Sequence, residues 1–244
     1  MSHHLIEARD VVFTYPDGQA ALRDISFVIH HGESVAIIGG NGAGKSTLLL
    51  HLNGVLRPTR GEVRIGDFPI TPETLAEVRR TVGMIFQDAD DQLFMPTVSD
   101  DVAFGLGHLG LSDEEIAQRV EQALATVGAS HLRARPPYRL SGGEKRAVAI
   151  AGVLAMSPSI LVMDEPSSGL DPAARRRLIN LLAGFEHTKV IATHDLDLVL
   201  DLCSRVLVMN QGVIEADGSP ANIFADRRLL ERCNLEVPLS YQRR

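Results

Sequence analysis

Nine consecutive residues near the start of the chain have the types and spacing of a phosphate-binding loop. Residues 39–47 read GGNGAGKST and fit the pattern G-x-x-x-x-G-K-[ST]. Glycines let backbone N–H groups turn toward one point, because no Cβ obstructs them. Lys45 can reach the β- and γ-phosphates of a nucleotide, and the Ser46 hydroxyl can bind Mg²⁺. The predicted phosphate-binding residues are Gly39, Gly40, Asn41, Gly42, Ala43, Gly44, Lys45, Ser46 and Thr47.

The segments on either side of this loop supply the context that the motif needs. The apolar run 35–38 predicts a buried strand, and residues 48–52 predict a helix. The start of a helix adds free N–H donors and a partial positive charge. A chance match is expected in about 1% of chains of this length from average residue frequencies. Phosphate binding is therefore favoured over a plain glycine turn.

Two adjacent carboxylates follow another buried strand. The apolar run 159–163 leads directly into Asp164 and Glu165. Downstream of a phosphate-binding loop, this is the Walker B pattern. Asp164 is predicted to bind Mg²⁺ through its water shell, and Glu165 to orient and deprotonate the water that attacks the γ-phosphate. Neighbouring residues on a strand point to opposite sides, which favours separate roles for the two carboxylates.

Two further polar residues end predicted strands of the same sheet. Gln87 follows the run 82–86, and His194 follows the run 190–193. Polar residues at the carboxyl ends of such strands face the ligand crevice. Gln87 is predicted to meet Mg²⁺ or the attacking water, with a simple loop glutamine as the alternative. His194 is predicted to donate a hydrogen bond to the γ-phosphate or to hold Glu165 and the water.

A second glycine-containing segment, LSGGE at residues 140–144, precedes an apolar helix. Ser141 and Glu144 have the spacing of a capping box, and Gly142 and Gly143 leave their N–H groups bare. This predicts a second anion-binding helix start. The segment has no lysine placed like Lys45, so alone it would bind phosphate weakly. A well-capped helix with no ligand is the alternative.

The remaining elements frame these motifs. Residues 5–30 alternate apolar and polar, which predicts antiparallel strands around a turn at 16–18. Tyr15 stands beside that turn and either stacks on a base or packs in the hairpin. Residues 88–157 predict a helical lobe inserted between strands. Asp171 is predicted to cap the next helix, and residues 206–215 predict a closing hairpin before a short helical tail.

Composition excludes several classes of protein. A net charge of −7 and the lack of a basic run exclude a protein that coats nucleic acid. Cys203 and Cys233 are too few for a disulfide framework, so a reduced cytoplasmic setting is expected. No signal peptide and no apolar run of about 20 residues is present, which predicts a soluble chain that can dock on a membrane protein. His3–His4, His30–His31 and Arg175–Arg177 are interpreted as solvated surface.

Taken together and in this order, the motifs resemble the ATP-binding-cassette (ABC) ATPase family over almost the whole chain. The LSGGE element separates that family from other P-loop proteins. The resemblance implies an α/β fold: one ABC ATPase domain, 1–244, with a P-loop NTPase (RecA-like) core sheet. Its expected parts are the core with an N-terminal antiparallel β subdomain (1–87 and 158–225), an inserted α-helical subdomain (88–157) and a C-terminal tail (226–244).

The resemblance also implies that two cassettes bind ATP and Mg²⁺ head to tail. Each nucleotide would lie between one P-loop and the other chain's signature helix. Ser141, Gly142, Gly143 and Glu144 would hold the γ-phosphate across the interface, and Asp171 would contact the opposite P-loop. Tyr15 matches the adenine-stacking aromatic of the family. Gly40 departs from the proline of many members, which costs backbone entropy but keeps the loop geometry.

A narrower likeness points to membrane partners. Residues 86–105 and 145–156 look like the energy-coupling-factor importers of cobalt, nickel or vitamins, and most like their cobalt-type ATPase subunit. This implies a peripheral subunit on the cytoplasmic face of the cell membrane. Its partners would be a second ATPase subunit, as a homodimer or with a related chain, and transmembrane coupling and substrate-binding subunits. The segment Gln87–Met95 would contact the membrane subunits. Its acidic residues 88–91 lack the spacing of a calcium loop, so a partner contact or a helix cap is expected.

Other functions compete with this interpretation. The chain could serve another ABC importer, or be a non-transport ABC ATPase, although the long coiled-coil insertions of DNA-repair members are absent. A nucleotide-dependent regulator would not need Glu165 and His194, and a P-loop kinase has no use for LSGGE. The sequence does not identify a transported substrate, because membrane subunits would select it.

Overall fold

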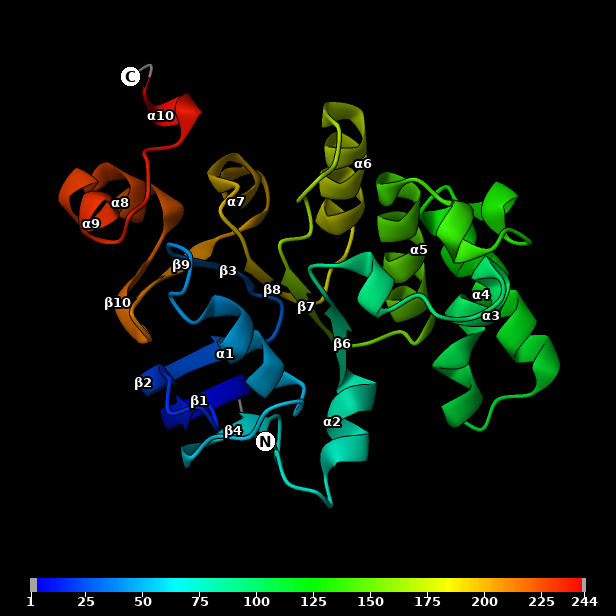
Figure 1. Ribbon diagram of the computed structural model, residues 1–244, viewed down its shortest axis with the longest axis horizontal. Helices are drawn as coiled ribbons and strands as arrows, with labels where there is room; N and C mark the ends of the chain where they lie inside the picture. Colours follow the sequence, from blue (N-terminus) through cyan, green and yellow to red (C-terminus); the bar gives the residue numbers. More distant parts are fainter. Residues whose placement is uncertain (1–3, 243–244) are drawn as a thin grey trace.

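The computed structural model describes residues 4–242 and contains two β-sheets with helices around them (Figure 1). The larger sheet has six strands in the order β10-β9-β3-β8-β7-β6. Their bounds are β3 Ser34–Ile38, β6 Val82–Ile85, β7 Ile160–Asp164, β8 Thr188–Ala192, β9 Arg205–Asn210 and β10 Val213–Gly218. β3 runs parallel to β8 and β9, and β7 runs parallel to β6 and β8. Most strands therefore end at one edge, where the predicted polar residues follow them.

The central strands are apolar throughout because both faces of this sheet are covered. Val35 and Ile37 of β3 point to one hydrophobic cluster, and Ala36 and Ile38 point to another. All four side chains are fully buried. This alternation follows from the two-residue period of a strand, so a single short run of apolar residues anchors two layers of the molecule.

A second sheet closes one side of the molecule. It has the order β2-β1-β4-β5, and every pairing is antiparallel. Its bounds are β1 His4–Thr14, β2 Ala20–His30, β4 Arg60–Ile65 and β5 Phe68–Pro69. Helix α1 (Lys45–Leu52) contacts both sheets, and its Leu48, Leu49 and Leu52 are fully buried. The helix that follows the P-loop is therefore held between two layers.

Helices cover the other face of the larger sheet. They are α6 Pro172–Ala183, α7 Leu196–Leu202, α8 Pro220–Ala225, α9 Arg227–Arg232 and the terminal α10 Leu239–Gln242. Leu178, Leu198 and Phe224 pack in the cluster on this face. The Cys233 sulfur is a free thiol in the same cluster, as is that of Cys203.

The segment between β6 and β7 is helical and forms the lobe on the right of Figure 1. Helix α2, Leu75–Thr81, precedes β6. The main helices of the lobe are α3 Val98–Phe104, α4 Asp113–Thr126 and α5 Gly142–Ala155. These three helices share a hydrophobic cluster that includes Val102, Leu124 and Val148. Ser112 caps α4, with a full capping box to Glu115.

The structure also tests the predicted exposure of the histidines. His30 and His31 are exposed, as expected, whereas His3 and the side chain of His4 lie outside the described residues. Within residues 4–242, no helix combines the length and the apolar character that crossing a bilayer requires.

Candidate functional site

A hollow of about 220 Å³ at the carboxyl edge of the larger sheet collects most of the predicted residues. It is lined by Tyr15, Gln19, Ala20, Ala21, Asn41, Gly42, Ala43, Gly44, Lys45, Ser46, Thr47, Gln87, Asp164, Glu165 and His194. The P-loop, the two carboxylates, the glutamine and the histidine are thus brought together. Strand topology explains this, since the elements carrying them end at the same edge.

The P-loop needs glycine at two positions for steric reasons. Gly44 has φ 101°, and a Cβ there would lie 2.6 Å from the Ala21 carbonyl oxygen. A Cβ on Gly39 would clash with the Met209 carbonyl oxygen. Lys45 is buried, and its Nζ donates to the carbonyl oxygens of Gly39 (2.8 Å) and Gly40 (3.2 Å). The ammonium group is therefore already inside the loop that phosphates would enter.

Tyr15 packs in the hairpin, which is one of the two roles that its sequence position left open. Its hydroxyl forms a 2.9 Å hydrogen bond with Thr47 Oγ1, and its ring meets the edge of Phe13 at a centroid distance of 4.9 Å. Phe13 in turn meets His51 at 4.8 Å. The tyrosine therefore packs in the hairpin, and it also lines the hollow beside the P-loop. The turn beside it is confirmed, because Gly18 N donates to the Tyr15 carbonyl oxygen.

Asp164 carries the chemistry expected of a metal ligand. Its side chain is 6% exposed, and its buried Oδ1 has no hydrogen-bond partner. Burial raises the pKa of this carboxyl, against the opposing effects of a hydrogen bond from Ser46 and the charges of Lys45 and Arg146. Burial likewise lowers the pKa of the Lys45 ammonium, with Glu165 and Asp164 opposing that change. An unsatisfied buried carboxylate oxygen beside a serine hydroxyl fits Mg²⁺, which takes hard oxygen ligands.

Glu165 is held by three contacts at the same edge. Thr193 Oγ1 donates to its Oε2 at 3.0 Å, and the His194 backbone N–H donates to the same oxygen at 3.3 Å. His194 Nδ1 lies 2.7 Å from the other oxygen, Oε1. The carboxylate is 6% exposed, while the histidine ring is largely exposed. Glu165 is therefore a hydrogen-bond acceptor held in one position, and its partner His194 lies on the solvent side.

The strand argument for the separate directions of Asp164 and Glu165 is wrong. β7 ends at Asp164, and Glu165 has φ 45°, in the left-handed region. A turn, rather than strand alternation, separates the two carboxylates. β6 and β8 also end two residues before Gln87 and His194, at Ile85 and Ala192, so those two side chains stand on the loops beyond the strands.

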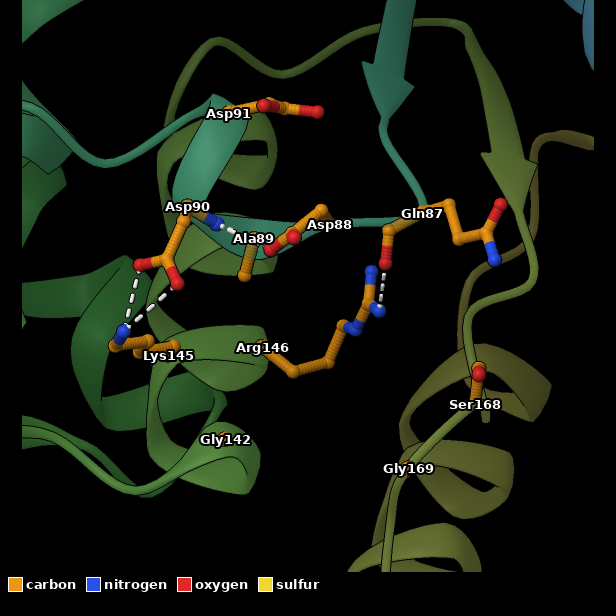
Figure 2. A pocket seen from close by; sticks show the side chains of 10 residues that line it. All are labelled: Gln87, Asp88, Ala89, Asp90, Asp91, Gly142, Lys145, Arg146, Ser168 and Gly169. Carbon is orange, nitrogen blue, oxygen red and sulfur yellow. Dashed lines mark hydrogen bonds and ion pairs between the residues drawn. The ribbon is translucent and has the colours of Figure 1, made fainter.

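The LSGGE segment lies elsewhere. Helix α5 begins at Gly142, and the predicted capping box is confirmed: Ser141 N donates to Glu144 Oε2 at 2.7 Å, and Glu144 N donates to Ser141 Oγ at 3.4 Å. Gly142 lines a second hollow of about 500 Å³ together with residues 87–91, Lys145, Arg146, Ser168 and Gly169 (Figure 2). Gln87 lines both hollows. Within one chain, the two helix starts that are predicted to bind anions therefore open into different spaces.

Asp171 caps helix α6, as predicted, because its Oδ1 accepts from Ala174 N at 2.8 Å. The expectation of a wholly solvated arginine triplet is wrong for the first member. Arg175 forms a two-pronged ion pair with Asp195 at 2.6 and 2.7 Å. Although burial opposes the change, the hydrogen bonds from Arg175 lower the pKa of the Asp195 carboxyl. Ser167 also donates to Asp195, at 3.1 Å.

Asp195 is a site residue that the sequence reasoning did not single out. Its backbone N–H donates to Thr193 Oγ1 at 3.0 Å, and that hydroxyl donates to Glu165. A chain of hydrogen bonds thus runs from Arg175 on α6 through Asp195 and Thr193 to the candidate base. Its position directly after His194, at a strand end, was the available signal.

The comparisons with known proteins agree with this geometry. A family model described as "ABC transporter" matches residues 22–168, more than half of the chain. A Geobacter sulfurreducens protein, whose name assigns it provisionally to the ATP-binding proteins of ABC transporters, is 64% identical over 99% of this chain and 97% of its own. The energy-coupling factor transporter ATP-binding protein EcfA of Methanocaldococcus jannaschii is 48% identical over 96% of this chain and 86% of its own.

Solved structures share the fold. The cbiO1 structure from Clostridium perfringens, described as part of the ABC transporter complex cbiONQ, has a TM-score of 0.82 and 38% identity over 96% of this chain and 95% of its own. A dimeric ATP-binding cassette in a post-hydrolysis state, bound to ADP and Pi, has a TM-score of 0.81 and 28% identity over 88% of this chain and 98% of its own. The predicted fold class, an α/β core with an antiparallel subdomain and a helical lobe, is confirmed.

Proposed function

Because the chain belongs to the ABC transporter family, as an ATP-binding protein, we propose that it energises micronutrient uptake through an energy-coupling-factor importer. Cobalt ion is the first candidate substrate, and nickel or a vitamin follows. Relatives named energy-coupling factor proteins and the likeness to cbiO1 support this choice. The family membership implies ATP hydrolysis, so the residues of the site are assigned roles in that reaction.

The observation that carries the proposal is the placement of Glu165 beside the P-loop. The carboxylate is buried and held by Thr193 and His194, and it lines the same hollow as Lys45 and Asp164. A fixed carboxylate can orient a water molecule and accept its proton as the water attacks phosphorus. His194 would steady that carboxylate and donate to the γ-phosphate.

The phosphates would be bound by the backbone of residues 39–47 and by the start of α1. Lys45 would exchange its two carbonyl contacts for the β- and γ-phosphates. Ser46, Asp164 and Gln87 would hold Mg²⁺, which when bound neutralises charge on the phosphate oxygens. Tyr15, oriented by Thr47 and Phe13, would stack on adenine.

The second anion site would serve a second copy. Gly142 and Gly143, at the capped start of α5, leave backbone N–H groups without intrahelical partners. Because Gly142 lines a different hollow from the P-loop, a γ-phosphate would reach both helix starts only between two chains. Ser141 and Glu144 would shape that contact, and Asp171 would meet the opposite P-loop. A homodimer with two complete sites is the simplest assembly.

The outer side of the 87–95 segment fits a membrane partner. Phe94 is 62% exposed and Phe104 is 48% exposed, and their rings meet at 4.9 Å. The backbone N–H groups of Phe94 and Met95 both donate to the Asp101 carboxylate at 3.0 Å, which holds the aromatic pair in place. An exposed apolar pair on a fixed loop is typical of a docking surface. The chain would work at the cytoplasmic face of the membrane, without nucleic acid.

The test is reconstitution with the membrane subunits of an energy-coupling-factor importer from the same organism. ATP hydrolysis should rise when they are present. ⁵⁷Co²⁺ should enter vesicles only when ATP and the ATPase chain are on the inside, because an importer moves its substrate toward the face that carries the ATPase. F94S should abolish the stimulation and leave basal hydrolysis intact. F68S changes another exposed phenylalanine, on β5, which is 44% exposed, and serves as the control. Stimulation without cobalt uptake would transfer the proposal to nickel or vitamins, and absence of stimulation would refute it.

A further inference from the structure

Arg146 of helix α5 occupies an unusual environment. Arg146 is only 6% exposed, and its guanidinium donates to two backbone carbonyl oxygens. Nη1 donates to Phe86 O at 2.6 Å. Nη2 donates to Gln87 O at 2.5 Å, and Figure 2 shows this second contact. Burial lowers the pKa of the guanidinium, opposed by the charges of Asp88 and Asp164. A positive charge is therefore held inside the protein by carbonyl dipoles and by carboxylates that it does not touch.

Such a placement is a poor way to stabilise a fold. Burying a charge carries a desolvation cost that neutral acceptors offset only in part. An apolar side chain of similar volume at this place on α5 would avoid that cost. The planar fork of arginine does, however, fix two acceptors in one geometry, which lysine or an apolar residue cannot do.

The next contact along α5 links the same segment at a second point. Lys145 Nζ lies 2.6 and 2.9 Å from the two carboxylate oxygens of Asp90. Asp90 sits in the short 3₁₀ turn Ala89–Asp91, on the side of the segment away from Gln87. Gln92 ties the segment to β6 instead, through Phe86 N at 2.9 Å and Met84 O at 3.2 Å. The segment 86–91 is thus clamped between the sheet and α5.

We propose that Arg146 is a positioning residue that sets the place of Gln87 according to the place of α5. This rests on the proposed function, in which Gln87 serves the P-loop hollow and the start of α5 meets the nucleotide of a second copy. In Figure 2 the Gln87 side chain points away from Arg146, while its carbonyl oxygen faces the guanidinium. Arg146 acts on the backbone and leaves the glutamine amide free. Arg146 lies two positions after the capping-box Glu144, so movement of the helix start carries Gln87 along.

R146K tests the assignment, because it keeps the charge and removes the fork. We expect kcat for ATP hydrolysis to fall by about tenfold to 100-fold, as for a misplaced catalytic group, with KM for ATP within about threefold of wild type. R146Q also lacks the charge and should lose more activity, so the activity of R146K should lie between those of R146Q and wild type. A parallel rise in KM would contradict the proposal, because the P-loop contacts do not involve Arg146.

A double-mutant cycle separates positioning from general stability. If Arg146 acts through Gln87, the Q87A/R146K chain should hydrolyse ATP no more slowly than Q87A alone. R205K is the matched control: Arg205 on β9 also donates to a backbone carbonyl, Val28 O at 2.8 Å, and lies outside the site. R205K should leave kcat unchanged. If the loss in kcat of Q87A/R146K equals the product of the losses of Q87A and R146K, the two residues act independently and the proposal is overturned.

Hydrogen exchange gives a readout that does not need turnover. Amides of residues 86–91 should exchange faster in R146K than in wild type, and at the wild-type rate in R205K. The proposed function would be refuted if the wild-type chain bound ATP but never hydrolysed it, with or without membrane subunits. Hydrogen exchange would still decide the role of Arg146 in that case. Unchanged exchange in R146K would refute the clamp itself.

Discussion

Asp164→Asn should make the protein more stable while it stops Mg²⁺-dependent hydrolysis. The buried Oδ1 of Asp164 has no partner, and burial raises the pKa of the carboxyl despite Lys45, Arg146 and Ser46 nearby. An unsatisfied buried acceptor costs about 1–3 kcal/mol, and more when it is charged. Asparagine keeps the shape and one unsatisfied atom but removes the charge, so we expect a gain of about 1 kcal/mol. For a chain of this length that is a rise in Tm of about 2–4 °C.

The pH dependence gives the sign of the effect. A carboxyl whose folded pKa is raised binds its proton more tightly in the fold, so its contribution is favourable at pH below the ordinary carboxyl pKa. That contribution is lost as the pH rises through the folded pKa. The advantage of D164N should therefore be present at neutral pH and shrink in acid.

Thermal unfolding with EDTA and no nucleotide, followed between pH 4 and neutrality, measures this directly. The matched control is D171N, because Asp171 is an exposed helix cap and asparagine caps equally well. Its Tm should stay near that of wild type. If D164N melts below wild type at neutral pH, then burial does not dominate at Asp164, and the carboxylate is a structural anchor rather than an unsatisfied metal ligand.

The remaining predictions address the base, the shared site and the hydrogen-bond chain. E165Q should retain ATP binding and lose about 10²- to 10⁴-fold in turnover; normal phosphate release would remove Glu165 as the base. K45A should weaken ATP binding in a titration, and a mixture of K45A with S141R chains should recover part of the activity that each lacks, unless the sites lie within single chains. R175A removes the ion-pair partner of the half-buried Asp195 carboxylate and should cost about 2 kcal/mol in urea unfolding at pH 7. Because the pKa of Asp195 is lowered, that deficit should fade as the pH drops through it; a deficit that persists in acid would contradict the ion pair.

Much of the candidate site could be predicted from the sequence because it is built on strand ends. The order of the motifs placed the P-loop, Gln87, Asp164 and His194 on one edge, as the parallel strands require. Local chemistry was equally readable, since a capping box is written in four consecutive residues. The Ser141–Glu144 box formed as expected.

Contacts between distant segments could not be predicted in this way. Arg146 reaches Phe86 across 60 residues, and Arg175 reaches Asp195 across 20. An arginine near the start of either helix could equally have pointed to solvent. Only the packing of α5 and α6 against the sheet decides which arginine is buried, and packing is a property of the whole fold.

The backbone at Glu165 shows why a correct assignment can rest on a wrong reason. Strand alternation predicts that consecutive carboxylates face opposite sides, yet a left-handed residue outside the strand places Glu165 beside His194. A non-glycine residue with positive φ is strained and persists where its surroundings hold it. Here Glu165 N donates to the Ala192 carbonyl, and the side chain accepts from Thr193. The end of β8 and the residue that follows it therefore hold the backbone and the side chain of Glu165. Substitutions at Thr193 should disturb the candidate base without touching the P-loop.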